Sequence, residues 1–489
     1  MPGVVKTRIT SDHSRKQRGV SLNETIDKSA HSLEYVRMTR MVECASMFGP
    51  GCGFSEVDAK HAFRNLDRSR ETLHLHCYNW KLPDRLKEGV AKVLGRALTT
   101  DDFVDRAVSF GSTSAPKLFD GLAVGLKHIS QTDIDKALGQ GNAWCMHLLD
   151  DQGTIARTPE LAAAAFDIVE NIYKDVGLPL SEPDKQGRGL VEGEWLGWWL
   201  CCKSQTTSLP KDKRDAYRAD CQRVLRERNS TKLQLLQLAG RLQHASLVFP
   251  GARPLINSMW ALAYKINQNQ PNHYSVKNTN RVREDASLFA EYLSVNHTWP
   301  FHLLVEEDEW PTDLDWPHDP GDSGHLYIVG DASGIDGAGV YGKGWCSTHR
   351  WLGHERADKV VLHGETSSTY LETMTAVRAI HTLIEREDSH NCRIEHFCDS
   401  QCTREVFRRG RSAVPMINDQ MRQLATVLVK RRVDVRVRWY NRDVAWIKIA
   451  DALSHCPPRS QAQLLVSRHT GEETDFVTLW SPTTAATRT

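Results

Sequence analysis

HLLDDQG, residues 147–153, is a short apolar approach followed by two adjacent acids, Asp150 and Asp151. Adjacent acids are common on protein surfaces, so this run means little alone. A second acid changes its meaning, because FSEVDAKHAF (residues 54–63) contains a short apolar segment that ends at Asp58. Strand-borne aspartates side by side would form a negative notch, which is costly unless divalent cations neutralise it. The pattern therefore indicates a site for Mg²⁺, which takes oxygen ligands and leaves room for substrate phosphates.

The composition is that of an ordinary globular protein. The 489 residues predict about three domains. With 40% hydrophobic and 25% charged residues, a disordered or collagen-like chain is excluded. The net charge is only +1, so binding of nucleic acid would depend on the local basic clusters at residues 6–18, 404–411 and 430–438. Solvated faces explain each single cluster equally well.

The cysteines and the apolar runs predict the compartment. The 12 cysteines show no paired C-x-x-C spacing, which argues against a zinc site or a disulfide scaffold and favours a reducing compartment. The first residues hold no apolar core of signal-peptide length, and no apolar run reaches the roughly 18 residues that span a membrane. We expect an intracellular protein of the cytoplasm, the nucleus or both, with no membrane partner.

Further motifs surround the first acids in a fixed order. They are RITSD (8–12), SLNE (21–24), FGSTSAP (110–116), LLDD (148–151), GLPLSEPDK (177–185) and WLG (195–197). Together with the segment around Asp58, this order resembles the fingers and palm of reverse transcriptases. Leu148 stands where that family usually has tyrosine. The stretch after the palm, residues 236–250, and the ADALS ending resemble DIRS-like (tyrosine-recombinase) or long-terminal-repeat retroelements.

The resemblance implies roles for individual residues. Asp58, Asp150 and Asp151 would hold two Mg²⁺ ions, with Mn²⁺ as an alternative, for nucleotidyl transfer. It also implies substrate contacts. Arg8 and Lys185 would bind the triphosphate, Phe110 and Gly111 would contact template and nucleotide, and Phe63 would exclude a ribose 2′-hydroxyl. A buried strand aromatic is the alternative explanation of Phe63.

A second set of acids follows in the last third of the chain. Residues 325–344 predict a strand ending at Asp331 and a hairpin, and residues 365–387 predict a helix that contains Glu372. The segment RIEHFCDSQ predicts a strand ending at Asp399, and AWIKIADALSH predicts a helix that contains Asp451. Acids from four separate segments suit a two-metal phosphodiesterase.

Asp399-Ser-Gln and the run Ala450-Asp-Ala-Leu-Ser resemble ribonuclease H. The resemblance implies that the four acids bind two Mg²⁺ ions and hydrolyse the RNA strand of an RNA–DNA hybrid. No histidine occurs at residues 440–450, where many members have a catalytic one. Each acid also has a structural alternative: Glu372 could form a capping box with Thr369, Asp331 could begin a turn, and Asp399 could cap a helix.

We therefore predict an α+β palm of the reverse-transcriptase right-hand fold, a helical thumb and an α/β RNase H-like domain with a mixed sheet. Within the thumb, residues 231–249 predict a helix with Leu233, Leu236, Leu242 and Leu247 near one face. The expected parts are truncated fingers and palm (1–200), thumb or connection (201–298), a linker rich in proline and acids (299–325), the RNase H-like domain (326–456) and a loosely ordered tail (457–489).

The predicted function is an RNA-directed DNA polymerase with RNase H activity from a retroelement. Its partners would be an RNA template, a DNA primer, RNA–DNA hybrid and deoxynucleoside triphosphates, while the oligomeric state stays open. The alternatives are a decayed or domesticated retroelement protein that binds nucleic acid without polymerising, and a nuclease with a non-catalytic palm.

Overall fold

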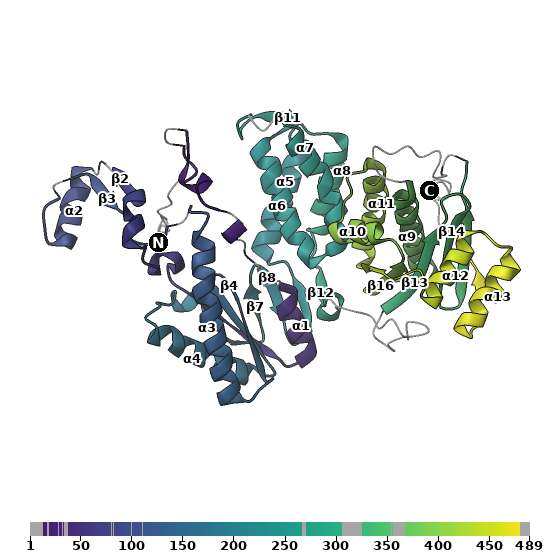
Figure 1. Ribbon diagram of the computed structural model, residues 1–489, viewed down its shortest axis with the longest axis horizontal. Coiled ribbons are helices and arrows are strands. Elements are labelled where there is room, and N and C mark those ends of the chain that lie inside the picture. The colour runs from purple at the N-terminus through teal and green to yellow at the C-terminus, as the bar shows by residue number, and fades with distance from the viewer. Residues whose placement is uncertain are drawn as a thin grey trace. The chain divides into compact units, whose positions relative to one another are not determined.

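The chain folds into two compact units, residues Met1–Gln205 and Thr206–Thr489, which we describe separately from a computed structural model (Figure 1). The structure describes residues 13–16, 19–27, 29–31, 33, 38–79, 81, 83–98, 100–109, 111–266, 270–305, 325–353, 355 and 367–479. Within these residues, every helix is too short or too polar to cross a membrane. The protein has a mixed α/β architecture with several sheets.

The first unit contains four α-helices and eight strands among its described residues. The helices are α1 (Met38–Phe48), α2 (Asp84–Leu94), α3 (Ala115–Leu138) and α4 (Pro159–Asp175). The strands are β1 (Gly53–Asp58), β2 (Cys77–Asn79), β3 (Asp102–Val104), β4 (Ala143–Leu148), β5 (Asp151–Ala156), β6 (Gly187–Leu190), β7 (Glu192–Trp195) and β8 (Trp198–Cys201).

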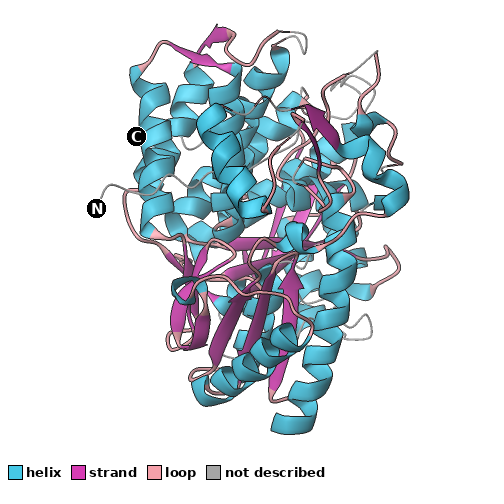
Figure 2. Cartoon of the chain, turned by 90° about the vertical axis from the view of Figure 1, so that its left-hand side faces the viewer, coloured by secondary structure: helices cyan, strands magenta, loops and turns pink. Residues whose placement is uncertain are grey.

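The central sheet of this unit has the strand order β4-β5-β1-β6 and is antiparallel throughout. Helices α3 and α4 cover one face, where Val57 and Ala156 pack against Phe119 and Phe166. In Figure 2 these magenta strands lie beside the long cyan helices. Since successive strand residues point to opposite faces, Asp58 faces away from these helices.

A hairpin of β7 and β8 packs on the other face of the sheet. A Cβ at Gly153 would lie 2.7 Å from the Trp195 ring, and one at Gly193 would lie 3.2 Å from Phe54, so these glycines permit the close approach. Trp195 is fully buried. The hairpin therefore makes this face a second packed layer beside the strand ends.

The second unit begins with a helical region. Its elements are β9 (Thr206–Ser208), α5 (Lys211–Arg226), β10 (Asn229–Thr231), α6 (Lys232–Val248), η6 (Pro250–Ile256), α7 (Asn257–Lys265), β11 (Ser275–Lys277), α8 (Asn280–Tyr292), β12 (Thr298–Pro300) and η7 (Phe301–Leu303). Thr231 starts α6 with a capping box that includes Gln234. The predicted helical character of this region is confirmed, while its role as a thumb remains a prediction.

The rest of the second unit is a six-stranded mixed sheet with helices on both faces. The strands are β13 (His325–Ala332), β14 (Gly337–Gly342), β15 (Trp345–Arg350), β16 (Arg393–Cys398), β17 (Asp434–Trp439) and β18 (Asp475–Phe476). The helices are α9 (Ser367–Arg386), α10 (Gln401–Arg409), α11 (Pro415–Arg431), α12 (Ala445–Ser454) and α13 (Arg459–Thr470). The strand order is β17-β16-β13-β14-β15-β18, with β13 parallel to β16. The predicted mixed sheet is thus confirmed.

Residue alternation along β13 builds two cores. Ile328 belongs to a core with residues of α9 and α11, and its neighbours Tyr327 and Val329 belong to a core with residues of α12 and α13. Figure 1 shows these helix pairs on either side of the green strands. The two layers hold β13 rigidly in the middle of the sheet, and Asp331 lies near its end.

Three details differ from the sequence-based expectations. The tail is not loosely ordered over its described part, because α13 packs on the sheet and β18 pairs with β15. The buried face of α6 is formed by Leu235, Leu238 and Leu242, whereas Leu233 and Leu247 are 43% and 38% exposed. Residues 299–305 of the expected linker belong to β12, η7 and the turn after them, where Phe301 is fully buried; residues 306–324 lie outside the described part.

Candidate active sites

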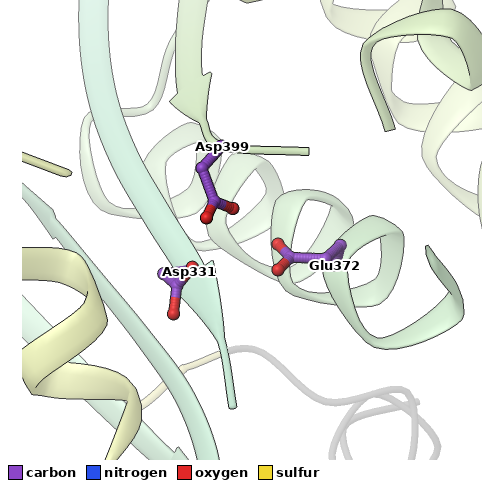
Figure 3. Close-up of side chains that lie close together, drawn as sticks. All are labelled: Asp331, Glu372 and Asp399. Carbon is purple, nitrogen blue, oxygen red and sulfur yellow. The ribbon is translucent and has the colours of Figure 1, made fainter. Parts of the chain in front are cut away.

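The sheet of the second unit brings three acids together at one edge. Asp331 lies on β13, Glu372 on α9, and Asp399 directly follows β16. One carboxylate oxygen from each lies within 4.8 Å of the others. Figure 3 shows the three side chains directed toward a common space. The parallel pairing of β13 with β16 explains the meeting, because parallel strands deliver their carboxyl ends to the same edge.

The structural alternatives for these three acids are wrong. Glu372 lies beyond the first turn of α9, which begins at Ser367, so it does not occupy the capping-box position. Asp331 pairs with Gly339 inside the sheet rather than beginning the turn. The cap of α10 is Ser400, whose hydroxyl accepts from the Thr403 N–H.

The surroundings crowd negative charge into a buried space. Asp331 and Glu372 are only 2% and 9% exposed. Burial, and then Asp399, raise the pKa of Asp331 to about 6. Burial also raises the pKa of Glu372 well above its usual range, with further contributions from Asp331 and Asp399. Such a cluster of carboxylates is stabilised by cations. Basic side chains nearby provide only part of the positive charge that would balance it.

Asp451 approaches this cluster without joining its 4.8 Å group among the described residues. It lies on α12, and its charge contributes to the raised pKa of Asp331. The helix lies unusually close to β14, since a Cβ at Gly339 would be only 2.3 Å from the Ser454 nitrogen. The Ser454 hydroxyl bonds to the Asp451 carbonyl oxygen at 2.7 Å. Asp451 thus lies on a helix that packs closely on Gly339, the strand partner of Asp331.

Two charged contacts at this site were missed by sequence reasoning. The Arg442 Nε donates to the Asp399 carboxylate at 2.8 Å. His455, just after α12, pairs with Asp336 of the hairpin turn at 2.7 Å, and this bond is the main cause of the raised His455 pKa. His455 follows Asp451 by four residues, whereas Arg442 belongs to no motif, and only the fold shows that both face acids.

In the first unit, Asp58 and Asp151 are neighbours across strands. They are register partners at the ends of β1 and β5. Leu149 and Asp150 form the two-residue turn between β4 and β5, and Leu149 has φ 54°, a left-handed conformation that is strained for leucine. The adjacent acids of the opening motif therefore lie at a tight hairpin turn directly beside Asp58.

The acids of the first unit are less tightly grouped than those of the second unit. They do not form a 4.8 Å group among the described residues. Their charges nevertheless interact: burial, and then Asp150 and Asp58, raise the pKa of Asp151 to about 7. Glu56, which sequence reasoning missed, has its pKa raised to about 8 by burial and then by Asp151 and Asp58. The two-residue strand period could have placed Glu56 on the face of Asp58.

Backbone contacts fix the position of Asp58. The Gln186 amide bonds both backbone groups of Asp58: the Asp58 N–H donates to Oε1 at 3.1 Å, and Nε2 donates to the Asp58 carbonyl at 3.1 Å. Ser181 N–H also donates to that carbonyl at 2.9 Å. The segment carrying the predicted triphosphate lysine is thereby tied to β1.

The predicted substrate contacts have varied surroundings. Phe63 is 7% exposed and meets Phe119 edge-on at 5.6 Å. It is thus buried, as its alternative explanation expects, but it lies in a 3-10 helix (Ala62–Asn65) and not in a strand. Lys185 is exposed and pairs with Glu182 at 3.5 Å. Gly111 has φ 106°, and its carbonyl accepts from Asn23 at 2.9 Å. Arg8 and Phe110 lie outside the described residues.

Comparison with known proteins gives structural likenesses alone. No family model matches the chain, and no curated protein sequence matches it. Among solved structures, a foamy viral protease-reverse transcriptase (dRH) in complex with double-stranded DNA has 12% identity and a TM-score of 0.41, covering 86% of this chain and 62% of that one. Foamy viral protease-reverse transcriptases with RNA/DNA hybrid and with double-stranded DNA each have 13% identity and a TM-score of 0.39; each match covers 84% of this chain, with 47% and 72% of the other chain.

The chain thus spans less than two thirds of the first of these structures. At such TM-scores and identities the likeness assigns no activity. The argument for a function must come from the acids and their surroundings.

Proposed function

We propose that the second unit hydrolyses the RNA strand of RNA–DNA hybrids with two divalent metal ions. The meeting of Asp331, Glu372 and Asp399 within 4.8 Å supports this proposal most strongly. Three acids from two strands and a helix, with Asp451 from another helix nearby, make up an all-oxygen donor set. Mg²⁺ prefers such ligands, and Mn²⁺ is a second candidate.

The buried carboxylates fit a metal. Asp331 Oδ1 is buried and has no hydrogen-bond partner among the described residues, although buried oxygens are normally satisfied. A cation would satisfy this oxygen and would also relieve the repulsion that raises the pKa values of Asp331 and Glu372. When bound, two such ions activate a water and stabilise the departing 3′-oxygen.

The chain's own residues would prepare this chemistry. The double-layered packing of β13 keeps the Asp331 carboxylate in place, and the Ala332 N–H bonds to Glu372 across the cluster. The adjoining rim offers Arg442 and His455 to an anionic strand. The acids can hold metal without a histidine before Asp451. Because the catalytic histidine of other enzymes is missing at residues 440–450, we expect hydrolysis to be slower than in those enzymes.

A labelled RNA–DNA hybrid tests this proposal. In Mg²⁺ the wild-type protein should cut the RNA strand, and Asp399→Asn should leave it whole, because a metal-binding carboxylate is lost. Asp388→Asn is a matched control, since Asp388 is 81% exposed and, within the described part of the chain, forms its ion pairs with Arg431 and His390. Cutting that persists in Asp399→Asn would refute the assigned acids.

A second candidate function belongs to the first unit. We propose that it copies RNA into DNA, and the supporting observation is the register pairing of Asp58 with Asp151 beside the strained turn at Leu149. Asp58, Asp150 and Asp151 would hold the metals, Arg8 and Lys185 the triphosphate, and Phe63 would select deoxynucleotides. RNA template, DNA primer and deoxynucleoside triphosphates would be the partners.

RNA-templated primer extension tests the second candidate. Wild-type protein should extend a DNA primer in Mg²⁺, and Asp150→Asn should abolish extension. Asp167→Asn, which alters an exposed aspartate paired with Arg188 on the same unit, should extend normally. If wild-type protein binds the primer–template without extending it, the polymerase proposal fails and the retained-binding alternative gains support.

A further inference from the structure

The segment between β17 and α12 is fastened along the Asp399 side of the acid cluster. Tyr440 N–H donates to the Cys398 carbonyl at 2.9 Å, and the Trp439 indole Nε1 donates to the Asp399 carbonyl at 2.9 Å. These two bonds lie on either side of the Asp399 backbone. The main chain leading to Arg442 is therefore fixed, whatever its side chain does.

The Arg442 side chain itself lies at the rim. Its Nε donates to Asp399 Oδ2 at 2.8 Å, while the two side chains are 65% and 11% exposed. An arginine so exposed loses little in leaving one carboxylate for another anion, because exposed ion pairs contribute weakly. The carboxylate, in contrast, is fixed by the sheet. Arg442 is thus the movable partner of the pair.

The balance of charges decides where Arg442 belongs. Asp331, Glu372, Asp399 and Asp451 present four carboxylates, and Arg442 interacts with all of them, most strongly with Asp399. Without metal, the arginine is the cation directly bonded to the cluster among the described residues. Two divalent ions would neutralise the four carboxylates by themselves, which would remove most of the attraction on Arg442. Its guanidinium is then suited to a phosphate, whose oxygens match its forked donors.

We propose that Arg442 is the built-in counter-cation of the acid cluster, displaced from Asp399 when divalent metal binds and then bound to a phosphate of the hydrolysed strand. The inference rests on the proposed hydrolytic function of the second unit. It assigns two successive anions to one arginine: a carboxylate before metal binding and a nucleic-acid phosphate afterwards. Arg442 and the metal therefore compete for Asp399, but they cooperate in binding the hybrid.

The first measurement is metal binding without nucleic acid. The whole chain is used, with Asp58, Asp150 and Asp151 all changed to Asn. These changes restrict Mn²⁺ titration calorimetry to the acid cluster of the second unit. In this background Arg442→Ala should tighten Mn²⁺ binding by up to about fivefold, the scale of one exposed ion pair. Arg188→Ala is the matched control, since it removes a similarly exposed arginine from Asp167 in the other unit. It should not alter Mn²⁺ binding.

The second measurement is hybrid binding in Ca²⁺, read by fluorescence anisotropy over a range of salt concentrations. Arg442→Ala should weaken binding and lower the slope of log affinity against log salt by about 1, as expected for one lost phosphate contact. Arg442→Lys should retain most of the slope, because it keeps the charge. Thermal melting of each variant excludes misfolding as the cause.

The outcomes separate the inference from the function beneath it. Unchanged Mn²⁺ affinity in Arg442→Ala overturns the competition for Asp399, and an unchanged salt slope overturns the transfer to phosphate. Either result leaves the hydrolytic proposal intact if wild-type protein still cuts the hybrid and Asp399→Asn does not. A wild-type protein that neither binds Mn²⁺ at this cluster nor cuts hybrid overturns both.

Discussion

Gly339 offers a direct test of how precisely α12 must be placed. It pairs with Asp331 in the sheet, and a Cβ at this position would lie 2.3 Å from the Ser454 nitrogen and 2.5 Å from the Ala450 carbonyl oxygen. Both are backbone atoms of the helix that contains Asp451. To reach an ordinary contact of 3.4 Å, α12 must move away by about 1.1 Å.

This displacement has two expected costs for Gly339→Ala. Overpacking should lower the free energy of unfolding by about 1–3 kcal/mol. Hybrid hydrolysis should fall by about 100-fold, because a misplacement of 1 Å at a reacting centre has effects of that size. Primer extension by the first unit should not change, since its acids lie on another sheet.

The assay compares Gly339→Ala with Gly353→Ala in the same unit. Among the described residues, no atom lies within 4 Å of a Cβ added at Gly353, so this control should behave as wild type. Hybrid cleavage, primer extension and urea unfolding are measured on all three proteins. Wild-type cleavage by Gly339→Ala, with unchanged stability, would show that Asp451 and its helix are not needed where the structure places them.

Two other predictions concern single side chains. Phe63→Val should raise ribonucleotide incorporation relative to deoxynucleotide by about tenfold or more, since it empties space that Phe63 fills beside Phe119; an unchanged sugar preference in primer extension argues against a gate. The pKa of Asp331 rises from 3.8 to about 6 on folding, so the folded state holds the extra proton and metal-free stability should fall as pH rises from 4 to 6. Asp331→Asn should make this fall smaller, although Glu372, whose pKa is also raised, still contributes to it. The change should stabilise the metal-free protein by about 1–3 kcal/mol at pH 7, measured by urea unfolding.

The meeting of Asp331 and Asp399 was easier to predict from the sequence than the charged partners of these acids. Asp331 and Asp399 each end an apolar run, and parallel strands deliver such ends to one edge, so their meeting follows from the strand pattern. The contact of Arg442 with Asp399 joins residues 43 positions apart across the edge of a sheet. No period or motif encodes that pairing, because it depends on which strand lies beside β16.

Errors arose where a pattern has more than one reading. In α6 the leucines are so frequent that several stripes are apolar, and packing selected Leu235, Leu238 and Leu242. The C-terminal stretch was expected to be loosely ordered because chain ends often are, yet α13 buries Ala462 and Val466 in a core and β18 pairs with β15. A local sequence indicates local structural preferences, whereas tertiary packing decided both of these outcomes.

Glycine explains why both groups of acids can be held in place. Gly153 lies two residues after Asp151 and leaves room for the Trp195 ring, and Gly339 lies opposite Asp331 and leaves room for α12. In each unit the missing side chain lets a second layer press against the strand beside an acid. A strand packed in this way cannot shift its end easily, so the carboxylates stay close although they repel one another. Because the carboxylates stay close and repel one another, they favour the binding of cations, and both proposed reactions require this property.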